Sequence, residues 1–148
     1  MPHDVFISYS SHDKPAADAT CAALEASGIR CWIAPRDITP GAEWGEAIID
    51  AISRCRVMIL IFSANANNSP QIRREVERVV SKGIPIIPLR IEDVPPARSL
   101  EYFIGTVHWL DALTPPLEFH LKRLVESVKA ILRINPTPPD IVVPGKAP

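Results

Sequence analysis

Glu75 is the residue whose position in the sequence points most clearly to chemistry. It lies in a helical segment that follows Ser69, at the edge of an apolar stripe rather than on the far polar side. The stripe is made by residues at helical spacing: Ile72, Val76, Val79 and Val80. A carboxylate there either faces a cleft, where it can stabilise developing positive charge, or is solvated and pairs with Arg74 or Arg78. The residues alone leave both alternatives open.

Other kinds of catalytic or metal site lack the residue spacing that they need. No glycine-rich phosphate loop, Ser–His–Asp order or Cys–His nucleophile pair stands out. The histidines are scattered without ligand spacing, at His3, His12, His108 and His120. The cysteines fit no metal motif and have apolar neighbours, at Cys21, Cys31 and Cys55. We therefore expect no metal site, and we expect the thiols to be small buried side chains in a reducing compartment.

Short β-type runs alternate with helical stretches along the chain. Strands are predicted at residues 5–8, 30–33, 57–62, 84–91 and 106–110. Helices are predicted at residues 14–26, 46–53, 70–82 and 117–132, with loops at 35–43 and 94–99. The run 57–62 is continuously apolar, which is typical of a strand covered on both faces. Pro85 and Pro88 predict that strand 84–91 lies at a sheet edge or that the prolines lie at its ends.

This alternation predicts an α/β fold, in which a parallel sheet carries helices on both faces. Five strands in a flavodoxin-like order are expected. Ligands bind beyond the carboxyl ends of the strands in such sheets. The loops at residues 9–13, 34–44 and 63–69 are therefore expected to border a binding site.

The length and composition indicate one globular domain. The chain has 148 residues, 47% of them hydrophobic, and a formal net charge of −1. This balance gives no electrostatic case for nucleic acid or an anionic membrane, and run 57–62 is too short to span a bilayer. Since no N-terminal signal pattern is present, a cytoplasmic location is expected. Residues 135–148 hold five prolines and are predicted to be a flexible tail or linker after a domain of residues 1–134.

Three segments together resemble bacterial Toll/interleukin-1 receptor (TIR) domains. The first is the strand and loop at residues 4–13, and the second is the strand and long loop at residues 28–41. The third joins the central strand, ending at Ser63, to the helix of residues 69–75. The resemblance covers residues 3–132 and implies the TIR fold, a flavodoxin-like five-stranded parallel sheet.

The resemblance also implies an activity. Enzymatic TIR domains cleave the nicotinamide–ribose bond of NAD+, so a hydrolase releasing nicotinamide with ADP-ribose or a cyclic ADP-ribose isomer is expected. NAD+ is then the substrate, and no cofactor is expected. The family further implies self-association through TIR–TIR contacts, a fused or separate sensor module, and a signalling role in bacterial antiphage defence.

The resemblance assigns the catalytic role to Glu75. In many relatives a tryptophan stands four residues before the glutamate, whereas this chain has Gln71. That departure puts in doubt any role that depends on the aromatic ring.

The resemblance also implies a set of substrate-binding residues: Tyr9, Ser10, Trp32, Arg36 and Trp44. Tyr9 and Ser10 would hold ribose and phosphates, and Trp32 would stack on a base. Arg36 would pair with a phosphate, and Trp44 would close the long loop over the site. Each has a structural alternative. Tyr9 and Trp32 could pack in the core. Arg36 could pair with Asp37, and Trp44 could anchor the loop to the next helix.

A second function is compatible with the same family. Many TIR domains are interaction scaffolds that catalyse nothing, and some bacterial ones act as effectors that mimic host immune receptors. In that case the loop from Pro35 to Trp44 would be the contact surface. Glu75 discriminates between the two, because a scaffold has no need of a carboxylate at that position.

Overall fold

The computed structural model describes residues 3–134 and shows a five-stranded, entirely parallel sheet in the order β2-β1-β3-β4-β5. The strands are β1 (Val5–Ser8), β2 (Cys31–Trp32), β3 (Val57–Phe62), β4 (Ile86–Arg90) and β5 (Leu110–Asp111). The helices are η1 (Ser11–Asp13), α1 (Lys14–Ala26), α2 (Trp44–Arg54), α3 (Ala64–Asn67), α4 (Pro70–Ser81), α5 (Arg98–Ile104) and α6 (Leu117–Ile134). The predicted flavodoxin-like fold is confirmed. The predicted tail, residues 135–148, lies outside the described residues.

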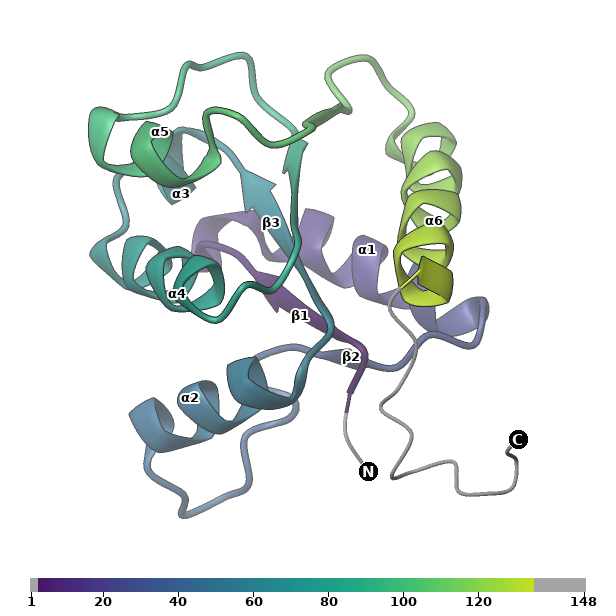
Figure 1. Cartoon of the computed structure of the whole chain (residues 1–148). Coiled ribbons are helices and arrows are strands. Elements are labelled where there is room, and N and C mark those ends of the chain that lie inside the picture. The colour runs from purple at the N-terminus through teal and green to yellow at the C-terminus, as the bar shows by residue number, and fades with distance from the viewer. Residues whose placement is uncertain (1–2, 135–148) are drawn as a thin grey trace.

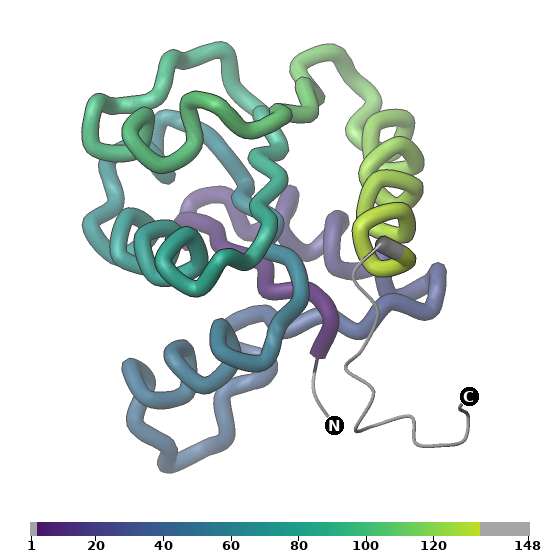
Figure 2. The backbone as a smooth tube through the Cα atoms, in the orientation of Figure 1, coloured from purple at the N-terminus to yellow at the C-terminus, as the bar shows by residue number. Residues whose placement is uncertain are grey.

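Helices cover both faces of the sheet. Figures 1 and 2 show α1 and α6 on one side and α2, α4 and α5 on the other. The side chains of β3 alternate between the two layers: Val57, Ile59 and Ile61 pack with α1 and α6, whereas Met58, Leu60 and Phe62 pack with α2, α4 and α5. All six are buried, as predicted for the continuous apolar run. Within residues 3–134, no helix is long and apolar enough to cross a membrane.

The structure differs from the sequence prediction around the last two strands. β4 is not an edge strand, because it pairs with β3 along its length and with β5. Pro88 is tolerated inside it because β5 pairs only with Leu89 and Arg90, which leaves the β5 side of Pro88 outside that short ladder. β5 begins at Leu110 rather than at Thr106.

One helix was missed. The proline-containing segment 94–99 was predicted to be a loop, but α5 begins at Arg98. Its apolar contacts come from Leu100 and Ile104, which are buried beside α4. Two apolar residues at helical spacing in a helix of 7 residues are a weak periodic signal.

The helix that carries Glu75 begins at Pro70 as predicted and ends at Ser81, one residue before the predicted end. The side chain of Ser69 accepts a hydrogen bond from the backbone N–H of Ile72 at 3.2 Å, and Pro70 occupies the first helical position. The chain leaves α4 through Gly83 at φ 73°, a left-handed conformation that suits glycine. Together these ends fix which face of α4 turns toward the sheet.

The Ser69 cap gives a testable stability change. We expect Ser69→Ala to lower the free energy of unfolding by about 1 kcal/mol, because a backbone N–H of the first turn loses its acceptor. Urea denaturation followed by circular dichroism measures this. Ser99→Ala, at an exposed position in α5, is the control and should change stability by less than about 0.5 kcal/mol. Equal losses in the two variants would contradict the cap.

Candidate active site

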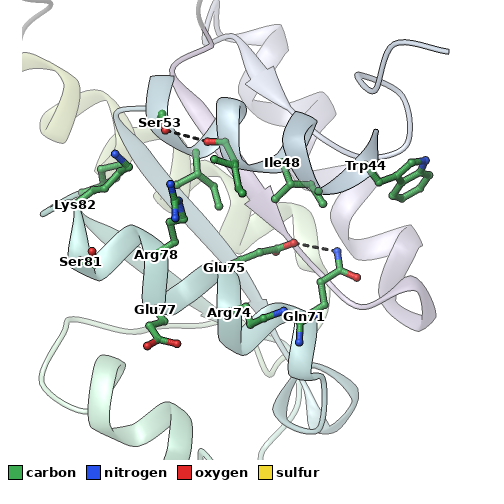
Figure 3. Close-up of a pocket in the computed structure, with 14 residues that line it drawn as sticks. Trp44, Ile48, Ser53, Gln71, Arg74, Glu75, Glu77, Arg78, Ser81 and Lys82 are labelled. Carbon is green, nitrogen blue, oxygen red and sulfur yellow. Dashed lines mark hydrogen bonds between the residues drawn. The ribbon is translucent and has the colours of Figure 1, made fainter. Parts of the chain in front are cut away.

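The carboxylate of Glu75 is buried and held by two side-chain donors. Glu75 is only 7% exposed. The hydroxyl of Ser8 donates to Oε1 at 2.8 Å, and the amide Nε2 of Gln71 donates to Oε2 at 3.0 Å. Figure 3 shows Gln71 one turn before Glu75 on α4, with its amide directed at the carboxylate. Each carboxylate oxygen therefore has its own donor.

Ser8 reaches Glu75 because of the two-residue period of a strand. Phe6 and Ser8 point to the same face of β1, and Phe6 packs in the layer of α2 and α4. Ser8 is 1% exposed at the last position of β1. The strand thus delivers a hydroxyl to the carboxyl edge of the sheet, on the side where α4 passes.

Burial and hydrogen bonding act on Glu75 in opposite directions. Burial raises the pKa of its carboxyl, because the charged form loses water, and this effect is the largest. The bonds from Gln71 and Ser8 and the charge of Arg74 lower the pKa, but the net direction is upward. Of the two sequence alternatives, the solvated glutamate in an ion pair is wrong. Glu75 is buried, and no ion pair to it occurs within residues 3–134.

Glu75 lines a groove between α2 and α4 with a volume of about 1160 Å³. The side facing it comes from α2, where Trp44, Ile48, Ile52 and Ser53 line the groove. The groove is also lined by residues of α4 and its C-terminal end, namely Gln71, Arg74, Glu77, Arg78, Ser81 and Lys82. Figure 3 shows Glu75 between the two helices, with Trp44 and Gln71 toward one end and Ser81 and Lys82 toward the other. A buried carboxylate of raised pKa in a groove is the combination expected of a reactive group.

The two candidate tryptophans lie in different environments. Trp44 lines the groove and is 54% exposed at the start of α2. Trp32 is 6% exposed and stacks on Phe6, with ring centroids 5.1 Å apart and planes 8° from parallel. Trp32 is thus a core residue that packs on Phe6, and it is not among the residues that line the groove.

The remaining predicted binding residues lie outside the groove, in the loops after β1 and β2. The hydroxyl of Tyr9 donates to the carbonyl oxygen of Ala34 and so joins these two loops. The hydroxyl of Ser10 accepts from the backbone N–H of His12 at 3.3 Å and caps η1. Neither side chain lines the groove with Glu75.

Arg36 forms ion pairs on the side of the sheet that α1 covers. Its guanidinium pairs with Glu25 and with Asp37, each at 2.8 Å, and donates to the carbonyl oxygen of Cys31 at 2.9 Å. The sequence alternative of a pair with Asp37 is confirmed, and the structure adds Glu25. To bind a phosphate, Arg36 would have to exchange at least one of these carboxylates.

The cysteines are buried and free, as predicted. Cys21 and Cys31 come together with Glu25, and their potential ligand atoms lie within 4.8 Å of one another. Sequence spacing gave no sign of this cluster, because α1 and β2 bring its members together. Burial raises the pKa of both thiols, and Arg36 already binds Glu25. As folded, the carboxylate of this cluster is held in an ion pair with Arg36.

Sequence reasoning missed Ser8 as a partner of Glu75. Its signal was available, since the period of two in β1 places Ser8 on the face of Phe6. Gln71 was noted only as a departure from an aromatic residue. Its amide is one helical turn from Glu75, which is the spacing at which side chains on a helix meet.

The protein is thus a small α/β domain with a parallel sheet, and a buried acidic side chain lies in a groove between two of its helices. The family model of the TIR domain matches residues 5–125. The chain therefore belongs to the TIR domain family, as the sequence resemblance indicated.

Solved structures of the same fold come from different organisms. The TIR domain of the Toll-related receptor TRR-2 from Hydra magnipapillata is 24% identical with a TM-score of 0.71, over 86% of this chain and 98% of that one. The TIR domains of the activated Roq1 resistosome are 14% identical with a TM-score of 0.70, over 85% and 99%. The CMP N-glycosidase BcmB of Clostridium botulinum is 20% identical with a TM-score of 0.63, over 84% and 98%. These likenesses show the fold. No match was found among curated proteins.

Removing the hydrogen bond that Gln71 donates should change the pKa of Glu75. Gln71 donates to the charged carboxylate, so Gln71→Ala should raise that pKa further. A pH titration of the Glu75 side-chain carbon by NMR measures the shift. Asn68→Ala is the matched control, because it removes an exposed amide that donates to Ala64 at 3.1 Å instead. An unchanged or lowered pKa in Gln71→Ala would contradict the assigned bond.

Proposed function

We propose that this TIR domain is an NAD+ glycohydrolase or cyclase that cleaves the nicotinamide–ribose bond. The observation that carries the proposal is the carboxylate of Glu75, which is 7% exposed, held by Ser8 and Gln71, and lines the groove between α2 and α4. A buried carboxylate without an ion pair lowers the stability of the folded state. Its presence therefore indicates a functional role rather than a structural one.

Cleavage of an N-glycosidic bond suits such a group. As the bond from C1′ to the pyridinium nitrogen breaks, the electron pair leaves with nicotinamide and the ribose gains oxocarbenium character. A fixed carboxylate stabilises that positive charge, and its donors hold it in place. Nicotinamide departs as a neutral base, so no general acid is required. Attack by water then gives ADP-ribose and a proton, whereas attack by the adenine gives a cyclic isomer.

The structural relatives support this chemistry at the level of bond type. One of the proteins with the same fold is a CMP N-glycosidase. The bond that this name implies, between a ribose and a nitrogen base, is of the same kind as the one that joins nicotinamide to ribose. The likeness supports N-glycosidic cleavage on this fold, and the choice of NAD+ rests on the sequence resemblance.

The predicted binding residues divide into two groups in this proposal. Trp44 is exposed in the groove and can stack on a base there. Trp32 supports the site from the core by stacking on Phe6, two residues before Ser8 on β1. Tyr9, Ser10 and Arg36 lie in the loops after β1 and β2, which border the Trp44 end of the groove, where they would meet the nicotinamide end of a dinucleotide.

Self-association and a defence role complete the proposal. Trp44 and Ile49 of α2 are 54% and 41% exposed and line the groove. A second copy that covered them would also exclude water from Glu75. We propose that TIR–TIR contacts activate the enzyme, within a bacterial antiphage system that includes a sensor module. In the alternative of a scaffold or host-mimicking effector, the same exposed surface would serve binding alone.

The role of Glu75 is tested by nicotinamide release. The purified protein at high concentration, with a crowding agent, is incubated with NAD+ and the products are separated by chromatography. We expect Glu75→Gln to lower the rate by about 100-fold or more, because the charge that stabilises the transition state is lost. Glu118→Gln, at an exposed position of α6 outside the groove, is the control and should retain activity. Equal rates for the wild type and Glu75→Gln, or no release by the wild type, would refute the proposal.

The pH dependence follows from the direction of the pKa shift. The reaction needs the charged carboxylate, so the rate should fall as the pH drops through the pKa of Glu75. Since that pKa is raised, the acid limb should lie above the ordinary glutamate value of about 4.3. The pH profile of kcat/KM measures it. An acid limb at or below the ordinary value would show that another group controls the rate.

A further inference from the structure

The groove between α2 and α4 has two chemically different ends. Trp44 and Gln71 stand toward one end and offer an aromatic face and an amide, and Arg74 adds one positive charge beside Gln71. Arg78 and Lys82 line the other end with two positive charges. Glu75 lies between these ends (Figure 3). A ligand that spans the groove past Glu75 would therefore meet a base-binding end and an anion-binding end.

The two cations are available to a ligand. Within residues 3–134, neither Arg78 nor Lys82 forms a salt bridge or a side-chain hydrogen bond. Figure 3 shows Arg78 extending toward α2, whereas the carboxylate of Glu77 points away from that helix. Glu77 also lines the groove, but among the described residues it forms no salt bridge with Arg78 or Lys82.

The spacing along α4 suits a group attached to the sugar that Glu75 contacts. With a rise of about 1.5 Å per residue, Arg78 lies about 4.5 Å and Lys82 about 10.5 Å further along the axis than Glu75. Long flexible side chains extend the reach of both residues. The C-terminal end of α4 carries a partial negative charge of about half an electron, which two full positive charges outweigh.

We propose that Arg78 and Lys82 form a phosphate subsite, which binds the 5′-phosphate of the ribose that loses its base and so orients the substrate. The base then lies toward Trp44 and Gln71, and C1′ lies beside Glu75. The inference rests on the proposed N-glycosidic cleavage and adds the orientation of the nucleotide. The substrate class is a nucleotide with a phosphate on the reacting ribose, and a nucleoside lacking that phosphate binds poorly.

The test compares nicotinamide mononucleotide with nicotinamide riboside, which differ only in this phosphate. Binding to the full chain carrying Glu75→Gln, which prevents turnover, is measured by calorimetry. We expect the mononucleotide to bind about tenfold or more tightly, because charge-assisted hydrogen bonds to a phosphate are strong. Adding Arg78→Gln and Lys82→Gln should remove this advantage. Adding Arg73→Gln, on the same helix but outside the groove, should retain it.

Three results would overturn the inference. The mononucleotide could bind no better than the riboside, undetectable binding included. Its advantage could survive the loss of Arg78 and Lys82, or Arg36→Gln could remove the advantage instead. A separate measurement tests the proposed function itself. If the wild type releases no nicotinamide from NAD+, the proposed function fails. Release that depends on Glu75, together with an unchanged mononucleotide advantage in the Arg78 and Lys82 variants, would reject the phosphate subsite alone.

Discussion

The desolvation of the Glu75 carboxylate is the constraint around which the site is organised. The folded protein keeps this group out of water with only a serine hydroxyl and a glutamine amide as direct donors. Because burial raises its pKa above that of the unfolded chain, protonation favours the folded state. The folded state accordingly loses stability as the pH rises from the ordinary glutamate value through the raised one. A site that accepts this cost gains a carboxylate whose field acts on a substrate with little screening by water.

The surrounding architecture explains how the carboxylate is held. Ser8 is the last residue of β1 and is fixed by the ladder between β1 and β3. Gln71 is fixed one turn before Glu75 by the capped start of α4. Trp32 stacks on Phe6, which lies two residues before Ser8 on the same strand. The position of the reactive group thus depends on the sheet and helix ends, while the neighbouring groove keeps exposed side chains for a ligand.

The sequence predicted the fold well where local signals were strong. The apolar run of β3, the capped α4 and the amphipathic α6 have patterns that tertiary contacts do not override. α5 and β5 are short, and their burial depends on neighbours far along the chain, so their bounds were missed. The site shows the same division. Glu75 could be singled out from its helix, but the contact with Ser8 joins residues 67 positions apart. The pairing of Arg36 with Glu25 likewise depends on how α1 packs against the loop after β2.

The most direct test of the account is a crystal structure of the Glu75→Gln protein with NAD+ bound. We expect C1′ of the nicotinamide ribose to lie about 3 to 3.5 Å from the side chain at position 75, which is the distance of a reactive encounter. The nicotinamide should lie toward Trp44 and Gln71, with the adjoining phosphate toward Arg78 and Lys82. A dinucleotide bound elsewhere on the domain, or with its ribose remote from position 75, would contradict the claim that this buried carboxylate acts on an N-glycosidic bond.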